Sequence, residues 1–243
     1  MKGILDGLDE IRNLYNLSEG DIEALQMVGN DLEELNSDYK VLSDHTGNQI
    51  FAYSKLTKEI DGLNVKLAKI EEKVDTILNS IGSMKDDEVR ARQQLEEVKS
   101  ILKDSKEKIR EYNLPIIPQN YFVELNEAQV AIKEIIRELD KKPITVDVLN
   151  TRVDTARDLV LKLYNTTKEM MKTAMFAEMA IVYGNRYRSS VNDLDKFLTY
   201  AEKLFNQGEY KRSLEISINS LKKVESGIYE KLLNLYALKN EQK

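Results

Sequence analysis

An apolar stripe with a period of about 3.5 residues, typical of helices that pack along one another, runs from Leu25 to Met84. Its positions alternate steps of three and four, and only Thr46 and Gln49 are polar: Leu25, Val28, Leu32, Leu35, Tyr39, Leu42, Thr46, Gln49, Tyr53, Leu56, Ile60, Leu63, Leu67, Ile70, Val74, Ile77, Ile81 and Met84. This period predicts a left-handed seam, and a single helix of about 90 Å could not bury it alone. The stripe therefore needs helical partners, which the rest of the chain should supply.

One polar patch interrupts the stripe, at His45-Thr46-Gly47-Asn48-Gln49. A loop fits this patch, since glycine costs about 1 kcal/mol in a helix interior. However, the register is the same on both sides, and a free loop need not preserve it. We therefore predict one continuous helix, with or without a kink, that passes through residues 45–49 and serves successive bundles with its two halves. In that arrangement Leu67 and Ile70 face the core, and His45 has neither a core nor a catalytic role.

The remaining helices are predicted from the spacing of apolar residues and from the residues that end helices. Gly82, Asp86 and Asp87 indicate a reversal at 82–87, with straight continuation as the main alternative. The prolines at 115, 118 and 143 should end helices, because each removes a backbone donor and restricts the residue before it. Amphipathic spacing then predicts helices over about 87–112, 119–141, 146–184, 192–205 and 214–235.

This order of long and short helices is typical of three-helix bundles strung in series, as in spectrin-type rods. The predicted fold class is all-α: tandem spectrin-like antiparallel three-helix bundles joined by long shared helices, in an elongated rod or arc. The predicted divisions are residues 1–45, the end of a preceding bundle, then 46–142, a spectrin-like three-helix bundle, and 143–243, a C-terminal helical bundle. Because the sequence begins inside a heptad pattern, we expect a piece of a longer protein.

Composition argues against several functional classes. The net charge of −6 argues against nucleic acid as the main partner, although residues 186–243 carry 11 Lys and Arg against 8 Asp and Glu, a net of +3. There is no cysteine, no metal-ligand spacing and no glycine-rich phosphate loop, and the lone histidine, His45, has no obvious catalytic partner. A signal peptide and an apolar run of about 18 residues are also absent. We therefore predict a soluble, non-enzymatic segment that needs no cofactor or metal.

Two helical stretches have alternative interpretations. Met170, Met171, Met175 and Met179 could form an adaptable binding surface, but core filling is the more common role of methionines at helical spacing. Residues 201–221 resemble one tetratricopeptide hairpin. Such repeats need several stacked copies with a period of about 34 residues, and we find one, so a helix hairpin within the last bundle is favoured.

The strongest local candidate for a binding site lies where the last long seam should end. Tyr183-Gly184-Asn185-Arg186-Tyr187-Arg188-Ser189-Ser190 replaces apolar seam positions with two arginines around a tyrosine and an amide. Arginine and tyrosine are favoured anchors at protein interfaces. An exposed helix end with ordinary ion pairs is an equally good interpretation of the composition.

The stretch from Ala177 to Ser189, which contains Asn185-Arg186-Tyr187-Arg188, resembles the C-terminal region of EzrA, the septation ring regulator of low-GC Gram-positive bacteria. Further stretches agree with that family: Ile50 to Ser54, Lys85 to Arg92, Asn113 to Pro118 and Gln207 to Tyr210. The resemblance covers about residues 15–225, and the Asn-Arg-Tyr-Arg stretch is its most specific part.

The resemblance implies functions that periodicity alone does not. Members of this family have an N-terminal transmembrane helix and a cytoplasmic arc of spectrin-like bundles. They bind the tubulin-like division protein FtsZ and other division or cell-wall synthesis proteins, and they restrain ring assembly away from midcell. The implied location is the cytoplasmic side of the cell membrane at the division septum, through an anchor that this segment lacks. A C-terminal patch linked with midcell localisation maps onto Asn185, Arg186, Tyr187 and Arg188.

Two rival functions remain open at this point. One is a generic structural coiled-coil rod whose activity is oligomerisation, and self-association is compatible with the seams in either case. The other is an enzyme with an unrecognised site, which the lack of any convergent acid and base set argues against.

Overall fold

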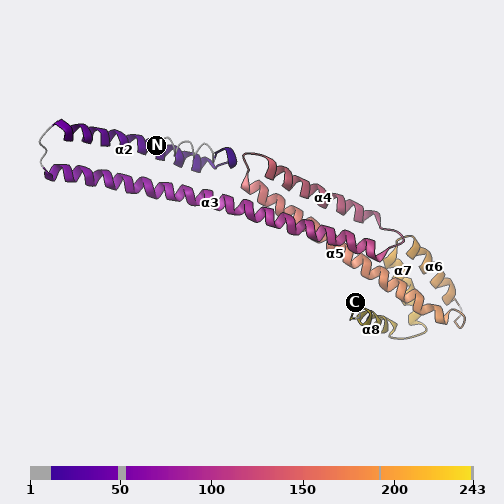
Figure 1. Cartoon of the computed structure of the whole chain (residues 1–243). Coiled ribbons are helices and arrows are strands. Elements are labelled where there is room, and N and C mark those ends of the chain that lie inside the picture. The colour runs from indigo at the N-terminus through magenta and orange to yellow at the C-terminus, as the bar shows by residue number, and fades with distance from the viewer. Residues whose placement is uncertain (1–11, 49–52, 192, 242–243) are drawn as a thin grey trace. The chain divides into compact units, whose positions relative to one another are not determined.

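The computed structural model describes residues 12–48, 53–191 and 193–241, with side chains for all of these except 45–48 and 237–241. Within these ranges the secondary structure is helical, and none of the residues lies in a β-strand. The elements are α2 (Glu19–Asn48), α3 (Tyr53–Tyr112), α4 (Gln119–Asp140), α5 (Val146–Gly184), the 3-10 helix η1 (Asn185–Tyr187), α6 (Leu194–Asn206), α7 (Tyr210–Lys222) and α8 (Ile228–Glu241) (Figure 1). The predicted all-α fold class is confirmed.

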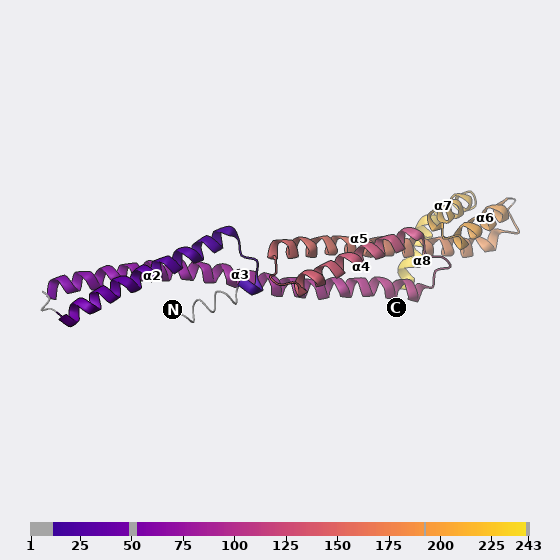
Figure 2. The ribbon, with the colours of Figure 1, turned by 90° about the horizontal axis from the view of Figure 1, so that it is seen from above.

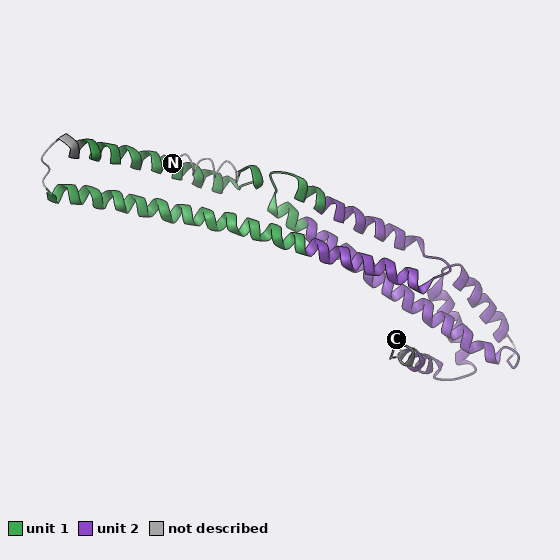
Figure 3. Ribbon diagram, in the orientation of Figure 1, with its two compact units in different colours: residues 1–93, 136–151 green, residues 94–135, 152–243 purple. Residues whose placement is uncertain are grey.

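The chain divides into two compact units, each assembled from separate stretches of sequence (Figure 3). Unit 1 comprises residues 1–93 and 136–151, and unit 2 comprises residues 94–135 and 152–243. Helices α3, α4 and α5 therefore each contribute to both units. The division of the chain at residues 45 and 142 stays a prediction.

In unit 1, α2 and the first part of α3 lie side by side and run in opposite directions (Figures 1 and 2). Their direction follows from the ion pairs, because Asp31 pairs with Lys73 and Asp38 pairs with Lys66, so that the numbers rise on one helix as they fall on the other. The stripe of apolar residues forms the seam between them, with a buried core of Leu17, Leu25, Val28, Ile70 and Ile77.

The predicted unbroken helix through residues 45–49 is wrong. α2 includes residues 45–48, residues 49–52 lie outside the described part of the chain, and α3 then runs back along α2 from Tyr53. Each arm of an antiparallel pair carries its own apolar stripe, and a turn of suitable length continues the spacing from one arm to the next, so a register that continues across a polar patch does not distinguish a straight helix from a hairpin.

The predicted reversal at residues 82–87 is also wrong, and the alternative of straight continuation is confirmed. α3 is one helix from Tyr53 to Tyr112 and passes through Gly82. A helical glycine costs about 1 kcal/mol, and seam packing outweighs that cost because Ile77, Ile81 and Met84 contact the same apolar cluster. The predicted core is right for Ile70, which is 5 % exposed, and wrong for Leu67, which is 41 % exposed.

Residues 14–16 form a latch within unit 1. The backbone N–H of Asn16 donates to the Ile144 carbonyl at 2.8 Å, and the N–H of Ile144 donates to the Leu14 carbonyl at 2.9 Å. The buried Tyr15 between them donates its hydroxyl to Glu88 on α3 at 2.8 Å. Burial and this hydrogen bond raise the pKa of Tyr15 to about 12. The latch joins the start of the chain to the α4–α5 connection and to α3.

Tyr15→Phe is expected to lower the free energy of unfolding by about 1–2 kcal/mol, because the buried Glu88 contact is lost. Because the folded-state pKa of Tyr15 lies above the ordinary tyrosine value of about 10, this tyrosine stabilises the fold at pH values below about 10. That stabilisation is lost as the pH rises through about 12. The difference between parent and variant in urea melts should therefore be constant from neutral pH to about 10 and narrow above it. Tyr53→Phe, at an exposed tyrosine, is the matched control and should melt like the parent.

In unit 2, the second part of α3 packs with α4 and α5 as a three-helix bundle (Figure 3). The prolines act as predicted, since α3 ends at Tyr112, α4 spans Gln119–Asp140 and α5 starts at Val146. α4 and α5 are antiparallel, because Glu124 pairs with Lys162 and Glu134 pairs with Arg152. The buried apolar side chains include Leu95, Val98, Leu102, Ile109, Tyr121, Ala128, Ile132, Ile135, Val153, Ala156, Val160 and Leu163.

The C-terminal helices of unit 2 continue from the end of α5. The predicted hairpin at 201–221 is present as α6 and α7, which turn at Gly208 with a φ of 81°. The Tyr210 hydroxyl donates to the Ile116 carbonyl at 2.5 Å and fixes this hairpin to the α3–α4 connection. α8 closes a core formed by Phe176, Ala180, Tyr183, Leu194, Leu198, Ile218, Leu221, Ile228 and Leu232. No helix in the described part of the chain combines the length and apolarity needed to cross a bilayer.

Candidate protein-binding patch after α5

The end of α5 is set by close packing at Gly184. A Cβ atom there would lie 2.7 Å from Leu198 Cδ1 and 3.2 Å from Leu221 Cδ2, so glycine lets α5 approach α6 and α7 closely. The chain then tightens into η1, in which successive side chains point about 120° apart rather than 100°. This change of pitch places Asn185, Arg186, Tyr187 and Arg188 in different surroundings although they are consecutive.

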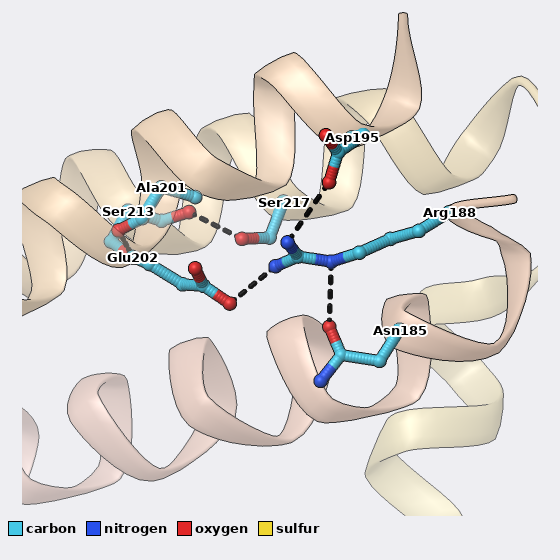
Figure 4. A network of polar contacts seen from close by, with 7 residues as sticks. All are labelled: Asn185, Arg188, Asp195, Ala201, Glu202, Ser213 and Ser217. Atoms are coloured by element: carbon cyan, nitrogen blue, oxygen red, sulfur yellow. Dashed lines mark hydrogen bonds and ion pairs between the residues drawn. The ribbon is translucent and has the colours of Figure 1, made fainter. Parts of the chain in front are cut away.

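Arg188 is a structural link between η1 and α6 (Figure 4). Its Nε donates to Asn185 Oδ1 at 2.9 Å and its NH1 group donates to Asp195 Oδ1 at 3.0 Å, while its NH2 group pairs with Glu202. The Arg188 side chain is 25 % exposed, whereas those of Asp195 and Glu202 are 63 % and 40 % exposed, so the ion pairs lie at the surface with the guanidinium partly covered. Asp195 and Glu202 lie seven residues apart on one face of α6, and together they hold the guanidinium from two sides.

A second cluster surrounds Tyr183. Its hydroxyl donates to Glu225 Oε2 at 2.5 Å, Tyr187 donates to the same oxygen at 3.4 Å, and Lys231 donates to Glu225 Oε1 at 2.8 Å. The hydrogen bonds from Lys231 and then Tyr183 hold the pKa of Glu225 below its usual range. Glu225 is therefore ionised at neutral pH, and it joins the α5 end and η1 to the α7–α8 connection.

Arg186 differs from Arg188 in its exposure and its contacts. It is exposed, and its guanidinium carbon lies 4.2 Å from the centre of the Tyr183 ring. A cation stacked on an aromatic ring is held in place while its hydrogen-bond donors stay accessible. The exposed Asn185 beside it uses its oxygen for Arg188, which leaves its amide NH2 for other partners.

The structure thus brings all four predicted residues to one corner of unit 2 and separates their roles. Tyr187 and Arg188 are partly buried and contact other residues of the chain, whereas Asn185 and Arg186 are exposed. Sequence reasoning missed Glu225 and Lys231, which are distant in sequence and carry no motif. The spacing of Asp195 and Glu202 could have been noticed, because two acids one heptad apart offer a matching pair to an arginine. In the described residues, no group of His, Asp or Glu is arranged to hold a metal ion.

Comparison with known proteins identifies the family of the chain. Residues 1–236 match the family model described as "Septation ring formation regulator, EzrA". The chain belongs to the EzrA family. It is 27 % identical over 221 residues to the septation ring formation regulator EzrA of Staphylococcus epidermidis, covering 91 % of this chain and 39 % of the relative. The EzrA of Bacillus pumilus is 27 % identical over 223 residues, covering 92 % of this chain and 39 % of the relative.

A third relative, EzrA of Listeria monocytogenes, is 25 % identical over 237 residues, covering 97 % of this chain and 42 % of the relative. The chain therefore spans about two fifths of the length of these EzrA proteins. A solved structure, described as the cytoplasmic domain of bacterial cell division protein EzrA, matches with a TM-score of 0.63 and 20 % identity, over 97 % of this chain and 45 % of that chain. This likeness supports the all-α fold. The family membership that the sequence resemblance predicted is confirmed.

Proposed function

We propose that this chain is a non-catalytic, protein-binding part of a septation ring regulator that binds FtsZ and other division or cell-wall synthesis proteins and restrains ring assembly away from midcell. Family membership supports this role, and the observation that carries the binding site is the exposed, stacked Arg186 beside the exposed Asn185. The mechanism is placement: spectrin-like helical bundles hold binding patches at fixed positions. An anchor in the full-length protein would keep them on the cytoplasmic side of the membrane at the septum.

The contacts indicate different roles for the four residues of the proposed patch, which are Asn185, Arg186, Tyr187 and Arg188. Arg188 stabilises the patch through Asp195 and Glu202, and Tyr187 does so through Glu225. Arg186 and Asn185 offer hydrogen-bond donors to the partner. Arg188 and Lys231 are paired with acidic residues of the chain, whereas the exposed Arg186 lies over the Tyr183 ring. A partner segment that carries a carboxylate fits the accessible guanidinium of Arg186.

The binding proposal is tested by co-sedimentation of the chain with polymerised FtsZ. We expect the parent chain to sediment with the polymer in a saturable manner. A chain that stays in the supernatant at every FtsZ concentration would refute direct FtsZ binding by this part of the protein.

Arg186→Ala is expected to weaken septal recruitment, and partner binding by about 2 kcal/mol, while melting stays nearly unchanged because an exposed cation–aromatic contact is worth about 0.5–1 kcal/mol. Arg188→Lys should instead lower the free energy of unfolding by about 2 kcal/mol, since lysine cannot reach Asn185, Asp195 and Glu202 together. The measurements are circular dichroism melts and septal localisation of the tagged full-length protein.

Lys223→Ala is the matched control, because Lys223 lies over the Phe197 ring at 5.2 Å but outside the patch. It should change neither melting nor localisation. If Arg186→Ala localises and binds like this control, the proposed patch is wrong.

A further inference from the structure

A groove lined by lysines lies between α3 and α4 in unit 2. Its volume is about 420 Å³, and four lysines line it: Lys99, Lys103 and Lys106 from α3 and Lys133 from α4. The rest of its lining is uncharged. Because α3, α4 and α5 already pack as a three-helix bundle around a shared core, the groove lies on the outer surface of that bundle and not at the place of a third helix.

The lysines of α3 belong to a row of cations on one face of the helix, the basic row, which consists of Lys99, Lys103, Lys106 and Arg110. Steps of four, three and four residues bring such side chains into line along a helix. Acidic residues are equally frequent in this stretch, but Glu97, Asp104 and Glu111 repeat every seven residues on a different face. The sequence thus separates the charges of α3 by face.

Two of the four lysines in the groove have no acidic partner within the chain. Lys99 and Lys103 each pair with a glutamate within one turn of α3, at 2.7 Å and 3.7 Å. Among the residues that the structure describes, no carboxylate forms an ion pair with Lys106 or Lys133. Their charges are therefore available to a carboxylate from outside the chain.

The groove side of α4 adds no negative charge to this surface. Glu124 and Glu134 point to α5, where they pair with lysine and arginine side chains at 3.5 Å and 2.5 Å. On the groove side α4 contributes Gln129 and Lys133. Phe122 lies seven residues before Gln129, hence on the same face of the helix, and is 50 % exposed. This surface therefore combines unpaired cations with an exposed aromatic ring.

We propose that this groove binds an acidic helical segment of a partner protein, whose carboxylates pair with Lys106 and Lys133. In helical assemblies, charges that flank the apolar seam select the partner helix. A partner helix with carboxylates at steps of three and four matches the basic row, and Phe122 offers it an apolar contact. The groove shares no residue with the proposed patch after α5, so either binding site can fail a test without the other.

The charge of the whole chain favours a short acidic segment over an extended polyanion. The chain has a net charge of −6, so a nucleic acid or an anionic bilayer would bring its many negative charges against an acidic protein. A helical segment confined to the groove meets mainly the local cations. The groove is also concave, which suits inserted side chains better than the flat surface of a bilayer.

The first test measures fluorescence anisotropy of a labelled peptide with the full chain at physiological ionic strength. The peptide is alanine-based and carries glutamates at the spacing of the basic row. A comparison peptide has the same composition, with its glutamates distributed around the helix. We expect saturable binding of the first peptide and an affinity about fivefold lower or more for the second, because only the first presents its carboxylates in line.

Lys106→Gln combined with Lys133→Gln is expected to lower the affinity for the first peptide about tenfold or more, because both unpaired cations are lost. Lys168→Gln combined with Lys172→Gln is the matched control, since these exposed lysines lie one turn apart on α5 outside the groove. The control removes the same charge and should bind like the parent. Both double variants should melt like the parent in circular dichroism, because none of the four lysines forms an ion pair within the described ranges.

A second readout uses the parent chain alone. Carbodiimide couples amino groups to carboxylates that lie in direct contact, and mass spectrometry then identifies the lysines joined to the bound peptide. We expect coupling at Lys106 and Lys133. Coupling spread evenly over the lysines of the chain overturns the proposal.

Other outcomes of the binding experiment also overturn it. They are a parent chain that binds neither peptide, equal binding of the two peptides, and a control that loses as much affinity as the groove variant. A parent chain that ignores the peptides but binds phosphatidylserine vesicles or duplex DNA through these lysines is a further one. So is a full-length protein that no longer binds the peptide, because its own chain would then cover the groove.

Discussion

Leu198→Asp is expected to unfold the C-terminal helices of unit 2 and to lower the free energy of unfolding by about 5 kcal/mol or more. Leu198 is fully buried in the core that joins α5, α6, α7 and α8, and its methyl groups fill the space beside Gly184. The substitution removes this packing and places a carboxylate in an apolar core. The measurements are urea melts followed by circular dichroism, with limited proteolysis to locate the unfolded segment.

Phe197→Asp is the neighbouring control, since Phe197 is partly exposed on the outer face of α6. A surface change of this kind should stay within about 1 kcal/mol of the parent. Equal melting of the two variants would show that the face of α6 assigned to the core is wrong.

Ile70→Asp is expected to separate α2 from α3 and to destabilise unit 1 by about 3–5 kcal/mol. Ile70 is buried in the apolar cluster of the hairpin seam, which also contains Leu17, Leu25, Val28 and Ile77. Hydrogen exchange of α2 amides would report the loss directly, because unpaired helices exchange much faster than packed ones. Val65→Asp, on the exposed face of α3, should leave α2 protected. Protection of α2 in both variants would contradict the hairpin core.

The sequence predicts where the helices of this protein lie better than it predicts which helices pack against one another. The prolines and the amphipathic spacing predict the ends of α4 and α5. This works because the missing backbone N–H of a proline, or the end of an apolar stripe, affects the helix at that position itself. The direction of the chain after residue 48 is not local information, because the same heptad spacing can continue through a straight helix or across the turn of an antiparallel hairpin. Gly82 is the opposite case: glycine disfavours a helix locally, but the apolar packing of the seam residues before and after it outweighs that effect.

Exposure within a seam also depends on how many helices are present. Leu67 and Ile70 are successive positions of the same apolar stripe, yet only Ile70 is buried, because α2 covers one flank of α3 and leaves the other open. Periodicity states which face of a helix is apolar. It does not state how many neighbours will cover that face.

For the patch after α5, the sequence identifies the segment but not the role of each residue. Arg186 and Arg188 have the same chemistry and lie two residues apart, and the 3-10 turn directs one to solvent and the other to Asp195 and Glu202. Glu225 approaches Tyr183 and Tyr187 only because α7 returns the chain to the end of α5. Contacts of that range depend on tertiary structure and leave no pattern in the sequence.

The discontinuous make-up of unit 1 has a consequence for how a newly synthesised chain folds. The hairpin joins residues 28 positions apart, as in Asp38 and Lys66, whereas the latch region joins residues 129 positions apart, as in Asn16 and Thr145. Loop closure costs more entropy as the separation grows, and Ile144 is made only after residues 94–135 of unit 2. During translation the hairpin therefore forms first, and the backbone hydrogen bonds between residues 14–16 and Ile144 form only after the α4–α5 connection leaves the ribosome.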